Sequence, residues 1–340
     1  MTIPSSEHEF FAAPRPVRRR HAVRLLAAAG AAAVLPSRGA DWRPVRPIRM
    51  VVPYAPGGTT DLIGRIVAGP LGRELGQEVV VDNRGGGGGT IGMGAVAQAA
   101  ADGYTIGMPA LGAHASNETL MAKLPYDSDR DFQPLAYIGQ SPLVVVAAPN
   151  NPARTLPELM ARAKSAGKGI NFASGGIGLG AHIAGELLKL RSGADMTHVA
   201  YKGGGPAMTD VMAGQVDMLF APIGTVLPLV RAGKLKALAI ASAARSPRMP
   251  EVPTMQEAGF PDFVMAESFG LLAPRGLPPE VAQRLQQAAA TVLRQPEVAR
   301  RMDEQGVDLA PAGPQQLDEF IRSEVRKYRD VIQRAGIKPS

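Results

Sequence analysis

The stretch IRMVVPYAPGGTTDLIGRIV, residues 48–67, indicates how this chain folds. Its first part, 48–54, is a short apolar run rich in valine, which is typical of a buried strand. The run ends in Ala55-Pro56-Gly57-Gly58, and apolar residues then recur at helical spacing from Leu62 to Leu71. The stretch therefore predicts a strand, a glycine-rich loop and a helix, in that order.

The same unit recurs along the chain. Further strands are predicted at 78–82, 104–108, 143–148, 171–173, 197–201, 216–221, 235–242 and 263–273. Helices are predicted at 90–101, 156–166, 181–190, from the loop 202–206 through Met212, and in three closing helices, of which the last covers 314–334. Continuous apolar strands that alternate with helices predict an α/β fold with mostly parallel sheets, covered on both faces.

Two such sets, followed by a returning C-terminal segment, predict two lobes. We expect residues 41–142 plus 264–340 to form lobe 1 and 143–263 to form lobe 2, with crossovers near 141–147 and 263–270. In open α/β sheets, ligands bind outside the carboxyl ends of the strands. A ligand is therefore expected in the cleft between the lobes.

Composition excludes several classes of protein. The chain has 340 residues, of which 45% are apolar and 20% charged, so a full core can form. It has no cysteine, which excludes disulfides, a thiolate nucleophile, a cysteine-ligated zinc and an acylated N-terminal cysteine. Residues 1–40 hold six arginines and two glutamates, so the net charge of +7 leaves 31 basic and 28 acidic residues, or +3, for the rest. These charges are scattered and aromatics are few, which argues against a nucleic-acid binder.

Residues 1–40 are predicted to be a signal peptide. Arg18-Arg19-Arg20 form a basic start, residues 25–35 are an unbroken apolar run, and small residues follow at 37–40. Eleven apolar residues are too few to cross a membrane, which needs about 20. Consecutive arginines before a mildly apolar run favour the twin-arginine route over general secretion. The protein is therefore expected in the periplasm after cleavage.

Three loops share one design, in which small residues connect a strand end to a helix start. Glycine lets the backbone approach a ligand closely, and the N–H groups of a first helical turn point toward an anion. Hydroxyls of Thr59, Thr60, Thr90 and Ser174 add donors, so a carboxylate needs no arginine here. Tight turns with helix caps are the structural alternative for each loop. The loops are Gly57-Gly58-Thr59-Thr60-Asp61, Gly85 to Thr90, and Ser174-Gly175-Gly176-Ile177-Gly178.

Four further side chains each allow a structural and a ligand-binding interpretation. Asp61 either complements the dipole of its helix, the interpretation we favour, or accepts a hydrogen bond from the ligand. Lys202, after Tyr201, either faces the ligand's negative charge or is solvated. His182 either packs or donates to a carboxylate, and Tyr54 either belongs to the core or walls the ligand site.

Catalytic, metal and cofactor motifs give no consistent pattern. Gly87, Gly89 and Gly92 match G-x-G-x-x-G, but no acidic residue ends a strand about 20 residues later, as a dinucleotide site requires. The G-x-x-x-x-G-K-[ST], G-x-S-x-G and H-E-x-x-H motifs are absent, and His114, His182 and His198 lack metal-ligand spacing. We predict no catalytic residue, no metal and no cofactor.

Longer segments resemble a known family. VVPYAPGGTTDLIGRIVAGPLGRELGQEVVVDNRGGGGGTIG (51–92) is similar to the opening of the substrate-binding receptors of tripartite tricarboxylate transporters, the Bug family. The resemblance extends from Pro47 to Gly336 and includes ADGYTIGM (101–108), LPYDSDRDFQPLAYIG (124–139), INFASGGIGLGAHIAGELL (170–188), HVAYKGGGPAMTDVMAGQVDMLF (198–220) and VPTMQEAGFPDF (252–263).

The resemblance implies a two-lobed periplasmic binding protein fold of the second type that closes like a Venus flytrap on a carboxylate. It also implies delivery to separately encoded membrane permease subunits; we expect a monomer without enzymatic activity. The ligand-binding residues expected from the loops and the resemblance together are Tyr54, Gly57, Gly58, Thr59, Thr60, Asp61, Gly87, Gly88, Thr90, Ser174, Gly175, His182, Tyr201, Lys202 and Gly203.

Two departures from the family pattern concern the ligand. Ala221 stands where relatives often have an acidic residue, and a tryptophan commonly precedes the Phe-Gly pair where this chain has Glu267-Ser268-Phe269-Gly270. Together they predict a ligand without a basic amino group. A sensory receptor of the same fold is the alternative function, and an NAD-dependent dehydrogenase using the Gly87-Gly89-Gly92 match is a more distant one.

Overall fold

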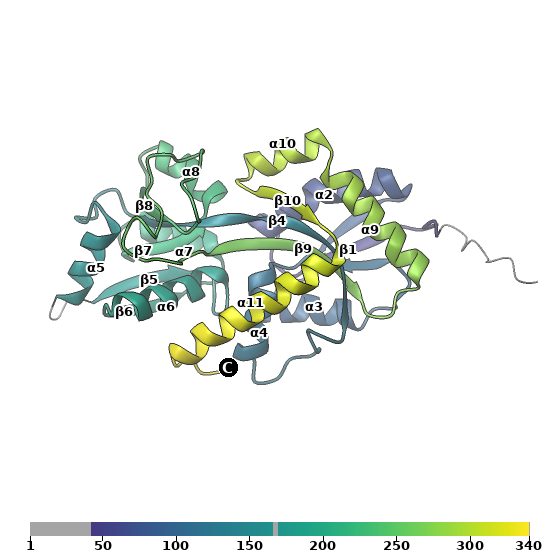
Figure 1. The fold of residues 1–340 in the computed structure, drawn as a ribbon, viewed down its shortest axis with the longest axis horizontal. Helices are drawn as coiled ribbons and strands as arrows, with labels where there is room; N and C mark the ends of the chain where they lie inside the picture. Colours follow the sequence, from purple (N-terminus) through teal and green to yellow (C-terminus); the bar gives the residue numbers. More distant parts are fainter. Residues whose placement is uncertain (1–41, 166–168, 340) are drawn as a thin grey trace, which may run out of the picture. The chain divides into compact units, whose positions relative to one another are not determined.

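The computed structural model describes residues 42–165 and 169–339 (Figure 1). The predicted signal peptide, with its arginine run and cleavage zone, lies outside the described residues. In chain order the elements are β1 (Ile48–Val52), α2 (Thr59–Leu75), β2 (Val79–Asn83), η1 (Gly87–Gly89), α3 (Thr90–Ala97), β3 (Thr105–Gly107), α4 (Leu111–Leu120), β4 (Phe132–Ala147), α5 (Leu156–Lys164), β5 (Ile170–Ser174), α6 (Gly180–Ser192), β6 (Met196–Ala200), α7 (Gly204–Met212), β7 (Met218–Pro222), α8 (Ile223–Arg231), β8 (Lys236–Ile240), β9 (Ala266–Pro274), α9 (Pro279–Leu293), α10 (Pro296–Glu304), β10 (Asp308–Ala312) and α11 (Pro314–Arg334).

The first sheet holds β1, β2, β3, β9, β10 and the beginning of β4. β1 lies between β2 and β3 and is parallel to both, as the strand–helix alternation predicts. β9 is antiparallel to β3 and β4, and β10 is antiparallel to β4. Helices α2 and α9 pack on one face, where Ile63, Val67 and Leu285 join a single apolar core.

The second sheet holds β5, β6, β7, β8 and the end of β4. β5 is parallel to β6 and β7, whereas β7 and β8 pair antiparallel with β4. β4 therefore belongs to both sheets: residues 132–142 pair with β9, and 143–147 pair with β7 and β8. In Figure 1, β4 and β9 run through the middle of the fold, with one α/β lobe on each side.

The structure extends the predicted β4 toward its N-terminus. The sequence predicts a strand only at 143–148, because Pro134, Gly139 and Pro142 interrupt the preceding apolar pattern. The structure accommodates the first two with register shifts near Pro134 and Gly139. Helices α4 and α8 and the edge strand β10 were also not predicted, because none carries a long periodic apolar pattern.

Helix α11 has the predicted bounds and contacts both lobes. Near its start, Leu317 packs in a cluster with Leu111 and Leu272. Near its end, Tyr328 and Ile332 pack in the core under the second sheet. Figure 1 shows this helix, in yellow, lying along both lobes. Among residues 42–165 and 169–339, no helix combines the length and apolarity needed to span a membrane.

Candidate functional site

The first glycine loop leads from β1 directly into α2. Gly57 has a φ of +84°, a left-handed conformation that favours glycine. The helix begins where the Leu62 N–H donates to the Gly58 carbonyl oxygen at 3.0 Å, and no side chain caps it. In the part of the chain that the structure describes, the N–H groups of Thr59 and Thr60 have no acceptor. They can therefore bind an anion.

Asp61 holds this loop in place. It is 2% exposed and accepts hydrogen bonds from the Gly57 N–H at 2.9 Å, Arg65 Nε at 3.0 Å and Asn83 Nδ2 at 3.0 Å. Burial acts to raise the pKa of Asp61, but the hydrogen bonds from Arg65, Gly57 and Asn83 outweigh it and hold the pKa below its ordinary value. Both carboxylate oxygens are thus used within the protein, which supports the structural interpretation of Asp61.

The second loop makes a left-handed turn before α3. Residues Gly86 to Gly89 all have φ between +56° and +127°. Asn117 Nδ2 donates to the Gly88 carbonyl oxygen at 3.1 Å, which ties the turn to α4. Gly87 is exposed, and Thr90 is buried at the start of α3. A side chain at any of these glycines would be strained, so the turn requires glycine.

Tyr54 lies against this second loop. A Cβ built on Gly89 would lie 3.2 Å from the Tyr54 hydroxyl oxygen. Burial, and then the negative charge of Glu267, raise the pKa of the Tyr54 phenol, which also interacts with the backbone of Ala110. Tyr54 is therefore neutral and half-buried, and it lies next to the glycine turn.

Two stacked histidines hold the third loop, 174–178, in place. The buried Ser174 hydroxyl lies 2.7 Å from His198 Nε2 and accepts a hydrogen bond from the Gly176 N–H at 3.1 Å. The Gly178 N–H donates to His182 Nδ1 at 3.1 Å. The rings of His182 and His198 stack with their centroids 4.0 Å apart.

Both histidines are neutral, because protonation is disfavoured in this stack. Burial and the neighbouring His198 lower the pKa of His182 to about 3, and burial lowers the pKa of His198 to about 4. Since His182 Nδ1 accepts from Gly178, its proton sits on Nε2, which is 3.9 Å from Glu186 Oε1. His182 thus holds the loop in place through Nδ1.

The loop after β6 lies beside the third loop, because β5 and β6 are parallel neighbours. The Gly203 N–H donates to the Gly175 carbonyl oxygen at 2.9 Å, and Gly203 has a φ of +117°. The Tyr201 hydroxyl donates to Asp210 at 2.6 Å, so it stays within its own lobe. Lys202 is exposed. Of these predicted residues, the backbone of Gly203 is thus the best placed beside the Ser174 loop.

Helix α4 connects glycine loops from the two lobes. Ser116 Oγ donates to the Gly178 carbonyl oxygen at 2.7 Å. The Gly88 turn approaches the same loop: a Cβ on Gly88 would lie 3.3 Å from Asn117 Oδ1 and 3.8 Å from the Ile177 carbonyl oxygen. Sequence reasoning missed Ser116 and Asn117. Their one signal was a polar run within a stretch of small residues, HASNET (114–119), of which 114–117 proved to be buried.

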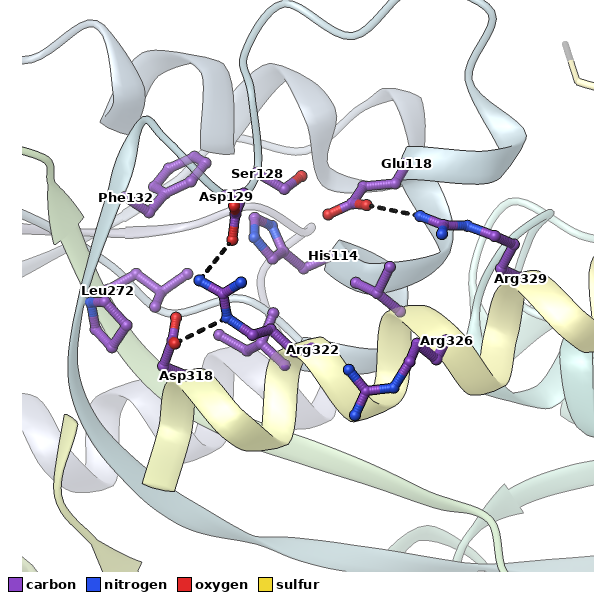
Figure 2. Close-up of a pocket in the computed structure, with 13 residues that line it drawn as sticks. His114, Glu118, Ser128, Asp129, Phe132, Leu272, Asp318, Arg322, Arg326 and Arg329 are labelled. Atoms are coloured by element: carbon purple, nitrogen blue, oxygen red, sulfur yellow. Dashed lines mark hydrogen bonds and ion pairs between the residues drawn. The ribbon is translucent and has the colours of Figure 1, made fainter. Parts of the chain in front are cut away.

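A separate cavity of about 270 Å³ lies between α4, the segment 128–134 and α11 (Figure 2). Arg322 pairs there with Asp129 at 3.0 Å and with Asp318 at 2.9 Å. Burial lowers the pKa of His114, which faces this cavity, to about 4. None of the predicted ligand-binding residues lines the cavity, so it is distinct from the glycine loops.

The glycine loops can bind a small anion through backbone amides and hydroxyls. The Ser174 hydroxyl is fully buried and already hydrogen-bonded, so it is not presented as a nucleophile. Within residues 42–165 and 169–339, no three His, Cys, Asp or Glu side chains are grouped to hold a metal ion. The protein has two α/β lobes, and a glycine loop from each lobe meets helix α4. This arrangement defines a solute-binding protein.

The comparisons with known proteins agree with this class. Residues 63–337 match the model of the tripartite tricarboxylate transporter family receptor, and the chain belongs to this family. The protein BugT of Bordetella pertussis is 39% identical over 314 residues, which cover 92% of this chain and 95% of BugT. The family is a family of binding proteins, as predicted.

Two solved structures are similar over nearly their whole length. The periplasmic binding protein BugD is 32% identical, with a TM-score of 0.80 and coverage of 87% of this chain and 100% of BugD. R. palustris Rpa4515, solved with adipate, is 32% identical, with a TM-score of 0.82 and coverage of 88% and 100%. The predicted family and the two-lobed α/β fold are therefore confirmed.

Proposed function

We propose that this protein is a periplasmic receptor that captures a small carboxylate and delivers it to the membrane permease subunits of a tripartite tricarboxylate-type transporter. The observation that carries the proposal is the approach of two glycine loops, one from each lobe, at Ser116 and Asn117. The open N–H groups of Thr59 and Thr60 supply positive potential without an arginine. The adipate in the similar structure supports a carboxylate as the ligand class.

We place the lobe boundaries at the predicted positions, 41–142 plus 264–340 and 143–263. The change of partner along β4, from β9 at Pro142 to β7 at Leu143, supports this division. Contacts from both lobes would then hold the ligand only in the closed form, so binding favours closure. The ligand-binding residues in this proposal are the loop residues predicted from the sequence. Asp61 and His182 act indirectly, because their hydrogen bonds hold the loops in place.

Thermal unfolding with a panel of organic acids tests the proposal. Because ligand binds only the folded state, a saturating acid at 100 times its Kd stabilises the protein by about 2.7 kcal/mol. We expect at least one di- or tricarboxylate to raise Tm, and titration calorimetry to give one site per chain. If no acid in a panel that includes citrate, malate, succinate, adipate and amino acids raises Tm, the proposal is wrong.

Export is tested separately, with the full-length chain. We expect the mature protein in the periplasmic fraction, with a new N-terminus near residue 40. Changing Arg18 and Arg19 to lysine is expected to block export if the twin-arginine route is used, whereas unchanged export would indicate general secretion.

A further inference from the structure

Ser141 and Glu267 lie opposite each other where the two sheets meet. They are partners in the antiparallel register of β4 and β9, next to the point where β4 leaves the first sheet for the second. Directly opposite residues of an antiparallel pair project from the same face, with Cβ atoms about 5 Å apart. The Ser141 hydroxyl and the Glu267 carboxylate are therefore neighbours at the junction of the lobes.

Polar groups at this junction lack partners. Ser141 and Tyr328 are both 0% exposed, and their hydroxyl oxygens have no hydrogen-bond partner among the described residues. Glu267, opposite Ser141, is half-buried. Buried polar groups are normally satisfied, so the two unpaired hydroxyls beside a half-buried carboxylate indicate that another group completes them.

The same groups lie close to the glycine loops. Burial raises the pKa of the Tyr54 and Tyr328 phenols, and the charge of Glu267 adds to this effect in both, after that of Glu324 in the case of Tyr328. Tyr54 in turn borders Gly89 of the second glycine loop. The Tyr328 hydroxyl lies near the first residues of α4 and α6: a side chain at Gly112 would clash with it, and a Cβ on Gly180 would lie 3.7 Å from it.

We propose that Glu267, with the hydroxyls of Ser141 and Tyr328, binds an ammonium group at the end of the ligand remote from its carboxylate. The ligand is then a small zwitterionic acid, with its carboxylate on the glycine-loop amides and its amino group on Glu267. This inference rests on the proposed function and narrows its ligand class.

The physical reason is charge compensation. Glu267 is half-buried, and desolvation of its carboxylate raises the pKa to about 7. An ammonium group would supply a compensating charge, whereas a second ligand carboxylate would add repulsion in a poorly solvated site. The hydroxyl oxygens of Ser141 and Tyr328 can accept hydrogen bonds from the remaining ammonium N–H groups.

A ligand with an ammonium group is the opposite of the ligand that the two departures from the family pattern predict. Ala221 is 4% exposed and packs in the apolar core under the second sheet with Ile223 and Val226. The uncharged side chain at position 221 therefore gives no information about the charge of the ligand. The carboxylate that matters is Glu267.

Matched pairs of acids test the inference by titration calorimetry at pH 8. The pairs are β-alanine and succinate, 4-aminobutanoate and glutarate, and 5-aminopentanoate and adipate, in which an ammonium replaces one carboxylate. For the length that fits best, we expect the amino acid to bind at least tenfold more tightly than the diacid. In Glu267→Gln that ratio should fall at least tenfold, and in Ser141→Ala severalfold. The control, Glu280→Gln on the exposed first turn of α9, should leave the ratio unchanged.

The outcomes separate the inference from the proposed function. If the wild-type protein binds diacids as tightly as amino acids, and Glu267→Gln leaves both affinities unchanged, the inference is wrong but the carboxylate receptor stands. If no acid from this set or from the earlier panel binds, the proposed function fails, and the inference fails with it. Thermal unfolding of each variant shows whether it is folded.

Discussion

Ser116 Oγ donates a hydrogen bond of 2.7 Å to the carbonyl oxygen of Gly178. Ser116 belongs to α4, which packs in the first lobe, and Gly178 belongs to the loop that opens α6 in the second lobe. The bond is buried, and the neighbouring Asn117 binds the Gly88 turn at the same time. One turn of helix thus sets how the two glycine loops face each other.

We predict that Ser116→Ala weakens this contact between the lobes. The Gly178 carbonyl oxygen would lose its buried donor, which costs about 1–3 kcal/mol. Part of that cost should appear as a larger radius of gyration of the ligand-free protein in small-angle scattering. The control is Ser323→Ala, whose hydroxyl donates to a backbone carbonyl on the exposed face of α11. An unchanged radius in both variants would show that the bond does not hold the lobes together.

We predict that Thr60→Val weakens ligand binding. Thr60 lies in the uncapped first turn of α2, and valine keeps its shape while removing the hydroxyl. If the hydroxyl donates to the ligand carboxylate, the loss is about 1–3 kcal/mol, or roughly 5- to 150-fold in Kd. Calorimetry with the best acid of the panel measures the change in Kd, and Thr291→Val, at an exposed position of α9, is the control. An unchanged Kd would remove the Thr60 side chain from the site.

The sequence was most informative where local rules decide the structure. Strand–loop–helix units were recognisable because the valine-rich run before Gly57 and the glycines at 85–89 mark element boundaries. The bounds of α11 followed from its apolar stripe and its proline start. What could not be predicted depends on contacts between distant segments. Nothing in the local sequence around Ser116 indicates that it contacts Gly178, 62 residues later, and nothing around Glu267 indicates that it lies opposite Ser141.

We predict opposite effects for alanine at two glycines. Gly89 has a φ of +97° and its Cβ would press on the Tyr54 hydroxyl, so Gly89→Ala should destabilise the protein by about 1–3 kcal/mol. Gly69 lies inside α2 with a nearest heavy atom at 3.9 Å, so Gly69→Ala should stabilise by up to about 1 kcal/mol. Urea unfolding measures both. Ligand affinity should fall only in Gly89→Ala, and a stable, fully binding Gly89→Ala would contradict the assignment of the second loop.

The last prediction concerns pH and stability. Burial raises the pKa of Glu267 from an ordinary value near 4.5 to about 7, so between these values the folded protein binds more protons than the unfolded chain. The contribution of Glu267 to the free energy of unfolding is therefore present below pH 4.5 and lost as pH rises through 7. The histidines act the other way. Burial lowers the pKa of His114 and His198 to about 4, so stability is lost as pH falls below 6.5.

The difference in stability between Glu267→Gln and the wild type separates the pH effect of Glu267 from that of the histidines. Tyr54, Tyr328 and Glu324 also face this region, but both phenols stay protonated because their pKa values are raised, and Glu324 is common to both proteins. Relative to the wild type, Glu267→Gln should therefore gain about 1–3 kcal/mol of stability between pH 5 and pH 8 in the absence of ligand. Urea midpoints at the two pH values measure this gain, and Glu280→Gln should show none. Parallel pH curves for the wild type and Glu267→Gln would mean that Glu267 is solvated, and the ammonium site would lose its physical basis.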